Sequence, residues 1–194
     1  MLKKIIFVYF FASLAVFADD VNLLSNPSFE TLNSKGLPVG YSASKKLTLD
    51  EIHGVDKNGA VDGKNAAMLV NTDPKIKLAN YAGYIQWGLQ NKLNTLKSGT
   101  EVEFSVYVKT DAPATKFFIY IEGADKNGKA FLKKIPAVSL KESNKWKQLR
   151  VEFRIPEAGV KNAYACFLIT STGKVWFDNA YLGSLENAPE PEGK

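Results

Sequence analysis

Two carboxylates stand near the ends of the patterned part of the chain, and their type allows several kinds of chemistry. Glu30 closes the stretch "NLLSNPSFE", and Asp178 lies in "GKVWFDNAYLG". A carboxylate in such a place can be a solvated surface acid, a catalytic acid or a metal ligand. A calcium ion takes about six to eight oxygen ligands, so one ligand from each end would tie the terminal strands together. The residue types alone leave these alternatives open.

Other residue types that serve catalysis or metal binding do not occur in the patterns those chemistries need. His53 has no serine or cysteine motif beside it, and Cys166 lies in the apolar run "AYACFLI", which is typical of a buried free thiol. The stretch "DKNGAVDGKN" resembles a calcium-binding EF-hand loop, but Val61 replaces its glycine and Ala67 its glutamate. No phosphate loop, zinc spacing, dinucleotide fingerprint or marked pair of carboxylates is present. We therefore interpret the chain as non-catalytic.

β-strands must position any site in this chain, because hydrophobic residues alternate with polar residues along several stretches of the sequence. In "EVEFSVYVK", residues 101–109, the apolar face carries Val102, Phe104, Val106 and Val108, and the other face carries Glu103, Ser105 and Tyr107. The stretches "KFFIYIEG" and "KQLRVEFRIP" are further strands, and turn residues separate them. Many short strands joined by turns predict an all-β fold, an antiparallel β-sandwich or a barrel.

The ends of the chain differ in composition from the strand-rich part. Residues 1–18, "MLKKIIFVYFFASLAVFA", have the basic start, apolar run and small-residue cleavage site of a signal peptide. We predict one domain over residues 19–185 and a disordered, proline-rich tail over residues 186–194. Removing the two leader lysines lowers the formal charge from +5 to +3, which is too mild and dispersed to indicate nucleic-acid binding. We expect a secreted protein, periplasmic or extracellular, with no membrane span.

Three motifs in order resemble the carbohydrate-binding modules of cellulases and xylanases, the group of families four, nine and twenty-two. The opening "NLLSNPSFE" is similar to that group's first strand, "DGKNAAMLV" to an inner strand, and "GKVWFDNAYLG" to the last strand. Each motif alone is weak, but together they span nearly all of the mature chain. The resemblance implies a galactose-binding-like jelly roll, a sandwich of two antiparallel sheets.

The resemblance also implies where ligands bind. In such modules a calcium ion often joins the first and last strands, a role that the family pattern carries onto Glu30 and Asp178. One concave sheet presents aromatic rings to sugars, whose flat C–H faces and hydroxyl rims suit aromatic platforms with polar neighbours. Taking the face opposite the aliphatic residues as the binding face, we expect a poly- or oligosaccharide to contact Tyr107, Tyr120, Phe118, Gln86, Glu103 and Glu122.

Two alternatives to sugar binding follow from the same residues. The aromatic side chains could instead lie under a loop or form a second small core. In addition, a jelly-roll scaffold supports many functions, and we expect it to make up the whole protein, with no catalytic domain attached. The chain could therefore be a structural or protein-interaction module of the cell envelope that binds a protein partner and no sugar.

Overall fold

A computed structural model of the chain describes residues 22–45, 53–75 and 82–190. The predicted signal peptide, residues 1–18, lies outside these ranges, as do the last four residues of the predicted tail. The start of that tail takes part in a short 3-10 helix, Leu185–Asn187. Among the described residues, none of the helices has the length and apolar character needed to cross a bilayer.

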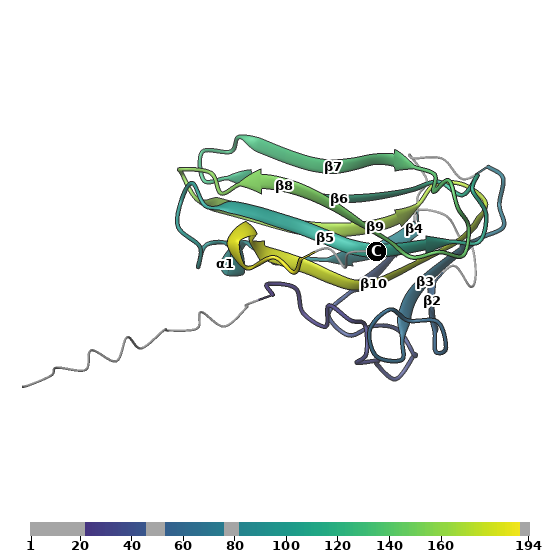
Figure 1. Cartoon of the computed structure of the whole chain (residues 1–194). Helices are drawn as coiled ribbons and strands as arrows, with labels where there is room; N and C mark the ends of the chain where they lie inside the picture. Colours follow the sequence, from purple (N-terminus) through teal and green to yellow (C-terminus); the bar gives the residue numbers. More distant parts are fainter. Residues whose placement is uncertain (1–21, 46–52, 76–81, 191–194) are drawn as a thin grey trace, which may run out of the picture.

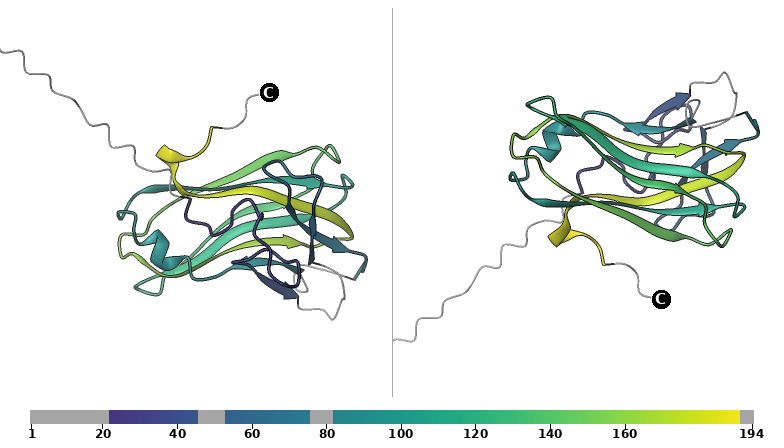
Figure 2. Two further views of the ribbon diagram at one scale, coloured as in Figure 1. Left: turned by 90° about the horizontal axis from the view of Figure 1, so that it is seen from below. Right: turned by 90° about the horizontal axis from the view of Figure 1, so that it is seen from above.

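The chain folds into two layers of antiparallel strands, which face each other in Figures 1 and 2. The first sheet has the order β1-β4-β9-β6-β7 and consists of β1 (Ser42–Lys45), β4 (Ala82–Gln86), β9 (Val160–Ile169), β6 (Phe117–Asp125) and β7 (Ala130–Val138). The second has the order β2-β3-β10-β5-β8 and consists of β2 (His53–Asp56), β3 (Ala66–Asn71), β10 (Gly173–Ser184), β5 (Glu101–Thr110) and β8 (Lys147–Arg154). A single helical turn, α1 (Gln90–Leu93), follows β4. The predicted all-β sandwich is confirmed.

The core between the sheets is built from alternate residues of each strand. In β5 the predicted apolar positions, Val102, Phe104, Val106 and Val108, are fully buried. Phe167 of β9 lies near the centre, with its ring centroid 5.8 Å from that of Phe104 and 5.3 Å from that of Phe177. Because successive side chains of a strand point to opposite faces, burial of these residues directs their neighbours outward.

Consecutive strands of this fold do not always belong to the same sheet. β5 pairs with β10 and β8 in the second sheet, whereas β6 pairs with β7 and β9 in the first. The connection between β5 and β6 therefore crosses from one layer to the other. It follows that the outward-facing residues of these two strands lie on opposite sides of the molecule.

The N-terminal segment closes the sandwich against the last strand. The backbone N–H of Leu23 donates to the carbonyl of Leu182 over 2.7 Å, which places the beginning of the described chain beside β10. Phe29 is fully buried, with its ring 5.0 Å from that of Tyr41. Its φ of 57° lies in the left-handed region, a strain that burial of the ring offsets. Anchoring Phe29 in the core fixes the position of the next residue, Glu30.

Candidate functional site

Aromatic side chains gather on the outer face of the first sheet. Phe118 and Tyr120 of β6 point outward because Phe117, Ile119 and Ile121 fill the core, as the sequence predicts. In β9, Tyr164 points the same way, since Ala163 and Ala165 belong to the core. The β6–β9 register places Glu122 directly across from Tyr164 and Tyr120 across from Cys166. Tyr120, Phe118 and Glu122 therefore share one face, as expected.

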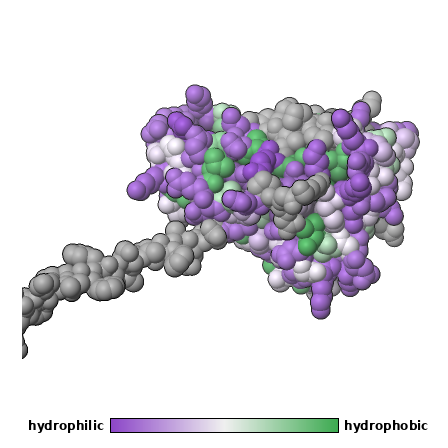
Figure 3. Space-filling model, in the orientation of Figure 1, coloured by the Kyte–Doolittle hydropathy of each residue, from purple (hydrophilic) through white to green (hydrophobic). Residues whose placement is uncertain are grey.

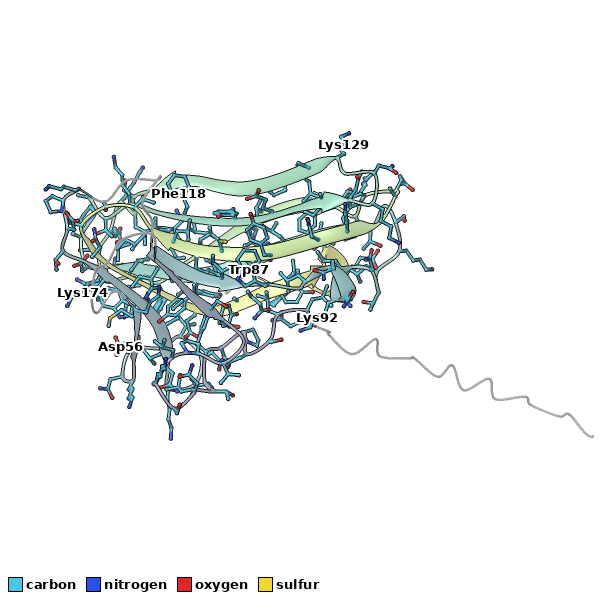
Figure 4. The ribbon with its side chains drawn as sticks, turned by 180° about the vertical axis from the view of Figure 1, so that it is seen from behind. Asp56, Trp87, Lys92, Phe118, Lys129 and Lys174 are labelled. Atoms are coloured by element: carbon cyan, nitrogen blue, oxygen red, sulfur yellow. The ribbon has the colours of Figure 1, made fainter. Side chains whose placement is uncertain are left out.

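The most exposed aromatic residue of this face is Trp87, which directly follows β4. Its side chain is 57% exposed, and its ring centroid lies 4.6 Å from that of Tyr164, with the planes inclined by 40°. Tyr164 in turn lies 6.4 Å from Tyr120, edge to face. The three rings form a row across β4, β9 and β6, which we call the aromatic platform. Figure 4 shows Trp87 and Phe118 on this side of the molecule.

A small apolar cluster supports the aromatic platform. Ile85, Cys166 and Leu168 are buried on the outer face, and Phe118, Tyr120 and Tyr164 pack against them. Burial raises the pKa of the Cys166 thiol to about 12, while a hydrogen bond with Tyr120 acts in the opposite direction. The rings of Tyr120 and Tyr164 thus belong to a second small core on one side and are partly open to solvent on the other. The alternative that these aromatic side chains form a second small core therefore holds for their inner side.

Gln86 faces the interior, contrary to the prediction that it contributes to the outer face. Its side chain is 2% exposed. The amide Oε1 accepts a hydrogen bond from the backbone N–H of Ser25 over 2.9 Å, and Nε2 donates to the Ser25 carbonyl, also over 2.9 Å. These two bonds satisfy the buried amide and join β4 to the N-terminal segment.

The orientation of β4 explains why sequence reasoning missed Trp87. Alternation alone leaves the phase of this strand ambiguous, and placing the apolar residues Ile85 and Trp87 inside puts Tyr84 and Gln86 outside. The structure has the reverse phase: Tyr84 is buried, and its hydroxyl donates to the Gly54 carbonyl over 2.8 Å. Burial of the two polar side chains is possible because distant backbone groups pair with them. Tyr164 could have been found from the alternation of "NAYACFLI", since Phe167 and Ile169 occupy the core phase.

Tyr107 and Glu103 do not join the aromatic platform. They point outward from β5, which belongs to the second sheet, so they lie on the opposite side of the sandwich. Glu103 is fully buried there, with its Oε2 atom 3.1 Å from Nη1 of Arg150. Figure 3 shows this side of the molecule, which carries many hydrophilic residues. The single patch expected from the sequence is therefore divided between two faces, because β5 and β6 belong to different sheets.

Glu30 and Asp178 meet at one turn, residues 61–65. Oε1 of Glu30 accepts hydrogen bonds from the backbone N–H groups of Lys64 and Asn65 over 2.6 and 2.7 Å. Oδ2 of Asp178 accepts from the N–H groups of Val61 and Asp62 over 2.6 and 2.9 Å. The N-terminal segment before β1 and the last strand, β10, are thus tied together through this turn, which brings the two carboxylates close to each other.

The remaining oxygens of these carboxylates also accept hydrogen bonds. Oε2 of Glu30 accepts from the Asn65 amide over 3.0 Å, and Oδ1 of Asp178 from the Asn179 N–H over 2.7 Å. Burial raises the pKa of Asp178 to about 6, and the backbone donors act in the opposite direction. N–H groups aimed at an oxygen present positive charge where a cation would approach. As arranged, these carboxylates suit amide donors better than calcium, and the described residues hold no cluster of three or more ligand-type side chains. Calcium binding stays a prediction.

Comparison with known sequences gives no assignment. No protein-family model matches the chain, and no curated protein sequence matches it.

Comparison of the fold with solved structures gives many similar chains. A family 16 carbohydrate-binding module matches with a TM-score of 0.58 and 18% identity, covering 84% of this chain and 100% of that one. The CBM22-1 xylan-binding domain from Paenibacillus barcinonensis Xyn10C matches with a TM-score of 0.55 and 18% identity, covering 85% and 95%. The module TmCBM61, solved in complex with β-1,4-galactotriose, matches with a TM-score of 0.56 and 15% identity, covering 84% and 99%. The protein therefore has the two-sheet β-sandwich fold of carbohydrate-binding modules.

Proposed function

We propose that the protein is a secreted, non-catalytic carbohydrate-binding protein that holds a poly- or oligosaccharide on the aromatic platform. The observation that carries this proposal is the exposed indole of Trp87 stacked on Tyr164, in line with Tyr120. A large exposed aromatic ring has a cost in water that a ligand with an apolar face removes. The pyranose ring of a sugar has such a face.

Polar groups beside the aromatic platform can bind the hydroxyl groups of a sugar. Glu122 lies next to Tyr164 in the β6–β9 register and is partly exposed. Its carboxylate can accept two or more hydrogen bonds from hydroxyl groups. The phenol groups of Tyr120 and Tyr164 can both donate and accept. We propose that stacking on the rings supplies most of the affinity and that Glu122 orients the sugar.

The platform runs across three strands, which suits an extended ligand with several sugar units. Structures with the same fold include a xylan-binding domain and a module bound to β-1,4-galactotriose. These relationships support xylan and β-1,4-galactan as the first ligands to test. Glu122 lies beside the aromatic platform, and its carboxylate favours neutral over acidic sugars at this face.

The test is a glycan array with the mature chain, followed by affinity electrophoresis of the parent and Trp87→Ala on each polysaccharide that is retained. The proposal predicts retention of the parent on at least one neutral polysaccharide and its loss in Trp87→Ala. The alternative of a cell-envelope interaction module predicts no retention on any glycan. That result, together with a specific protein partner, would replace the proposed function.

A further inference from the structure

Trp146, at the edge of the second sheet, is held in place by Lys109. The ammonium of Lys109 in β5 lies 4.7 Å from the ring centroid of Trp146 and 4.9 Å from that of Trp176. The same ammonium donates to the Gly59 carbonyl over 3.2 Å. Cation–π contacts of this kind fix the two rings on either side of the lysine. Trp146 is therefore an ordered side chain directly before β8.

A hollow lies beside Trp146 in the connection between β7 and β8. It has a volume of about 530 Å³ and is lined by Ser139, Leu140, Lys141, Glu142, Lys145, Trp146 and Lys147. Pockets of about 300 to 1,000 Å³ hold small-molecule ligands. This hollow lies where the chain crosses from β7 in the first sheet to β8 in the second, and none of its lining residues belongs to the aromatic platform, so the two are different places on the molecule.

The lining of this hollow is positively charged. It holds three lysines and one acid, and that acid, Glu142, forms an ion pair with Lys145 over 2.6 Å. Among the described residues, neither Lys141 nor Lys147 takes part in an ion pair. Both of these lysines are exposed. Two ammonium groups beside an ordered indole remain available to an anionic ligand.

The combination of an indole with ammonium groups indicates the chemistry of the ligand. A neutral sugar would stack on Trp146 but leave the lysines without a role, and a bare phosphate would use the lysines but not the ring. An acidic sugar residue uses both, because its C–H face packs on an aromatic ring and its carboxylate or sulfate accepts from lysine. We propose that this pocket binds an acidic saccharide, one that carries a uronate carboxylate or a sulfate ester. The proposal does not rest on sugar binding at the aromatic platform.

The experiment is isothermal titration of the mature chain with a short oligogalacturonate and a heparin-derived oligosaccharide, with xylohexaose as the neutral comparison. The test variant is Lys141→Gln with Lys147→Gln, which removes two charges without touching the core. Its matched control is Lys35→Gln with Lys161→Gln, which removes two exposed charges away from the pocket. Trp146→Phe tests the ring while keeping an aromatic side chain in place.

The proposal predicts that the parent binds an acidic probe and that added salt weakens this binding. The Lys141/Lys147 variant should weaken it about four- to 25-fold, since each exposed charge contributes a factor of about two to five. The control pair should change it less than about twofold. Trp146→Phe should weaken binding with an unchanged melting temperature.

Three results would overturn the proposal. The first is no binding of either acidic probe. The second is an equal loss in the control pair, which would show diffuse attraction by net charge. The third is a loss in Trp87→Ala as large as that in the lysine variant, which would place the acidic sugar on the aromatic platform. The proposed function fails in a different measurement: it is contradicted if Trp87→Ala is retained on neutral polysaccharides as strongly as the parent.

Discussion

The centroids of the Trp87 indole and the Tyr164 phenol ring lie 4.6 Å apart on the outer face of the first sheet, although Trp87 directly follows β4 and Tyr164 belongs to β9. The β4–β9 register, which pairs Gln86 with Ala165, brings them side by side. Tyr164 is partly buried against the supporting cluster, and its ring supports the indole of Trp87, which is exposed to solvent. This pair connects the fold to the proposed binding function.

Replacing Tyr120 tests the far end of the aromatic platform. Tyr120→Ala should weaken retention on a neutral polysaccharide about three- to tenfold, because one of three stacking surfaces is lost. It should also lower stability by about 1–2 kcal/mol, since the ring covers the cluster around Cys166. Tyr120→Phe keeps the ring and is the matched control. Affinity electrophoresis and thermal unfolding measure the two effects, and full retention by Tyr120→Ala would exclude this residue from the site.

Gln86 should affect stability and not binding. Gln86→Leu leaves the N–H and carbonyl of Ser25 without their partners, which should cost about 1–3 kcal/mol. For a domain of this size that corresponds to a fall in melting temperature of about 2–4 °C per kcal/mol. Ser25→Ala keeps the backbone groups and should be close to the parent. If Gln86→Leu lost sugar binding while it unfolded like the parent, the buried position of this side chain would be contradicted.

The alternation of hydrophobic residues was sufficient to predict most strands, the all-β sandwich and the outward direction of Phe118 and Tyr120. It could not predict which strands share a sheet, because the crossing between β5 and β6 depends on pairing with strands far along the chain. That crossing separated Tyr107 and Glu103 from the expected patch. The phase of β4 was also unreadable, since burial of Gln86 depends on the backbone of Ser25, 61 residues away.

Glu30 should stabilise the fold even when a chelator is present. Glu30→Ala removes the acceptor of the Lys64 and Asn65 N–H groups and should lower stability by about 1–3 kcal/mol. Substitution of Lys64 by alanine keeps its backbone N–H and serves as the control. Thermal unfolding in a chelator measures the difference. An unchanged melting temperature in Glu30→Ala would show that the turn at residues 61–65 does not depend on this carboxylate.

Calcium provides the second part of that test. If the ion binds between Glu30 and Asp178, as the resemblance implies, it should raise the melting temperature of the parent by mass action. It should not raise that of Glu30→Ala. If calcium shifts neither protein, the two carboxylates act only as acceptors for the amides of the turn, and the prediction of a calcium site is wrong.

Cys166 should make the stability of the fold depend on pH in the alkaline range. Its pKa is raised from an ordinary value near 9 to about 12 in the folded chain, because burial disfavours the thiolate. The buried neutral thiol stabilises the fold fully below pH 9, and this contribution is lost as the pH rises from about 9 towards 12. The parent should therefore lose stability relative to Cys166→Ala by up to about 1.4 kcal/mol per pH unit in that range. Parallel curves for the two proteins would contradict the raised pKa.

The most direct test of sugar binding at the aromatic platform compares Trp87→Ala with Tyr107→Ala on one neutral polysaccharide that retains the parent. Both changes remove an aromatic ring from an outer face, but Tyr107 belongs to the other sheet. The structure predicts a loss of about 30-fold in the affinity of Trp87→Ala, since truncating a central tryptophan costs about 2 kcal/mol. Tyr107→Ala should bind like the parent. Full binding by Trp87→Ala, or an equal loss in Tyr107→Ala, would contradict the assignment of the site to this face.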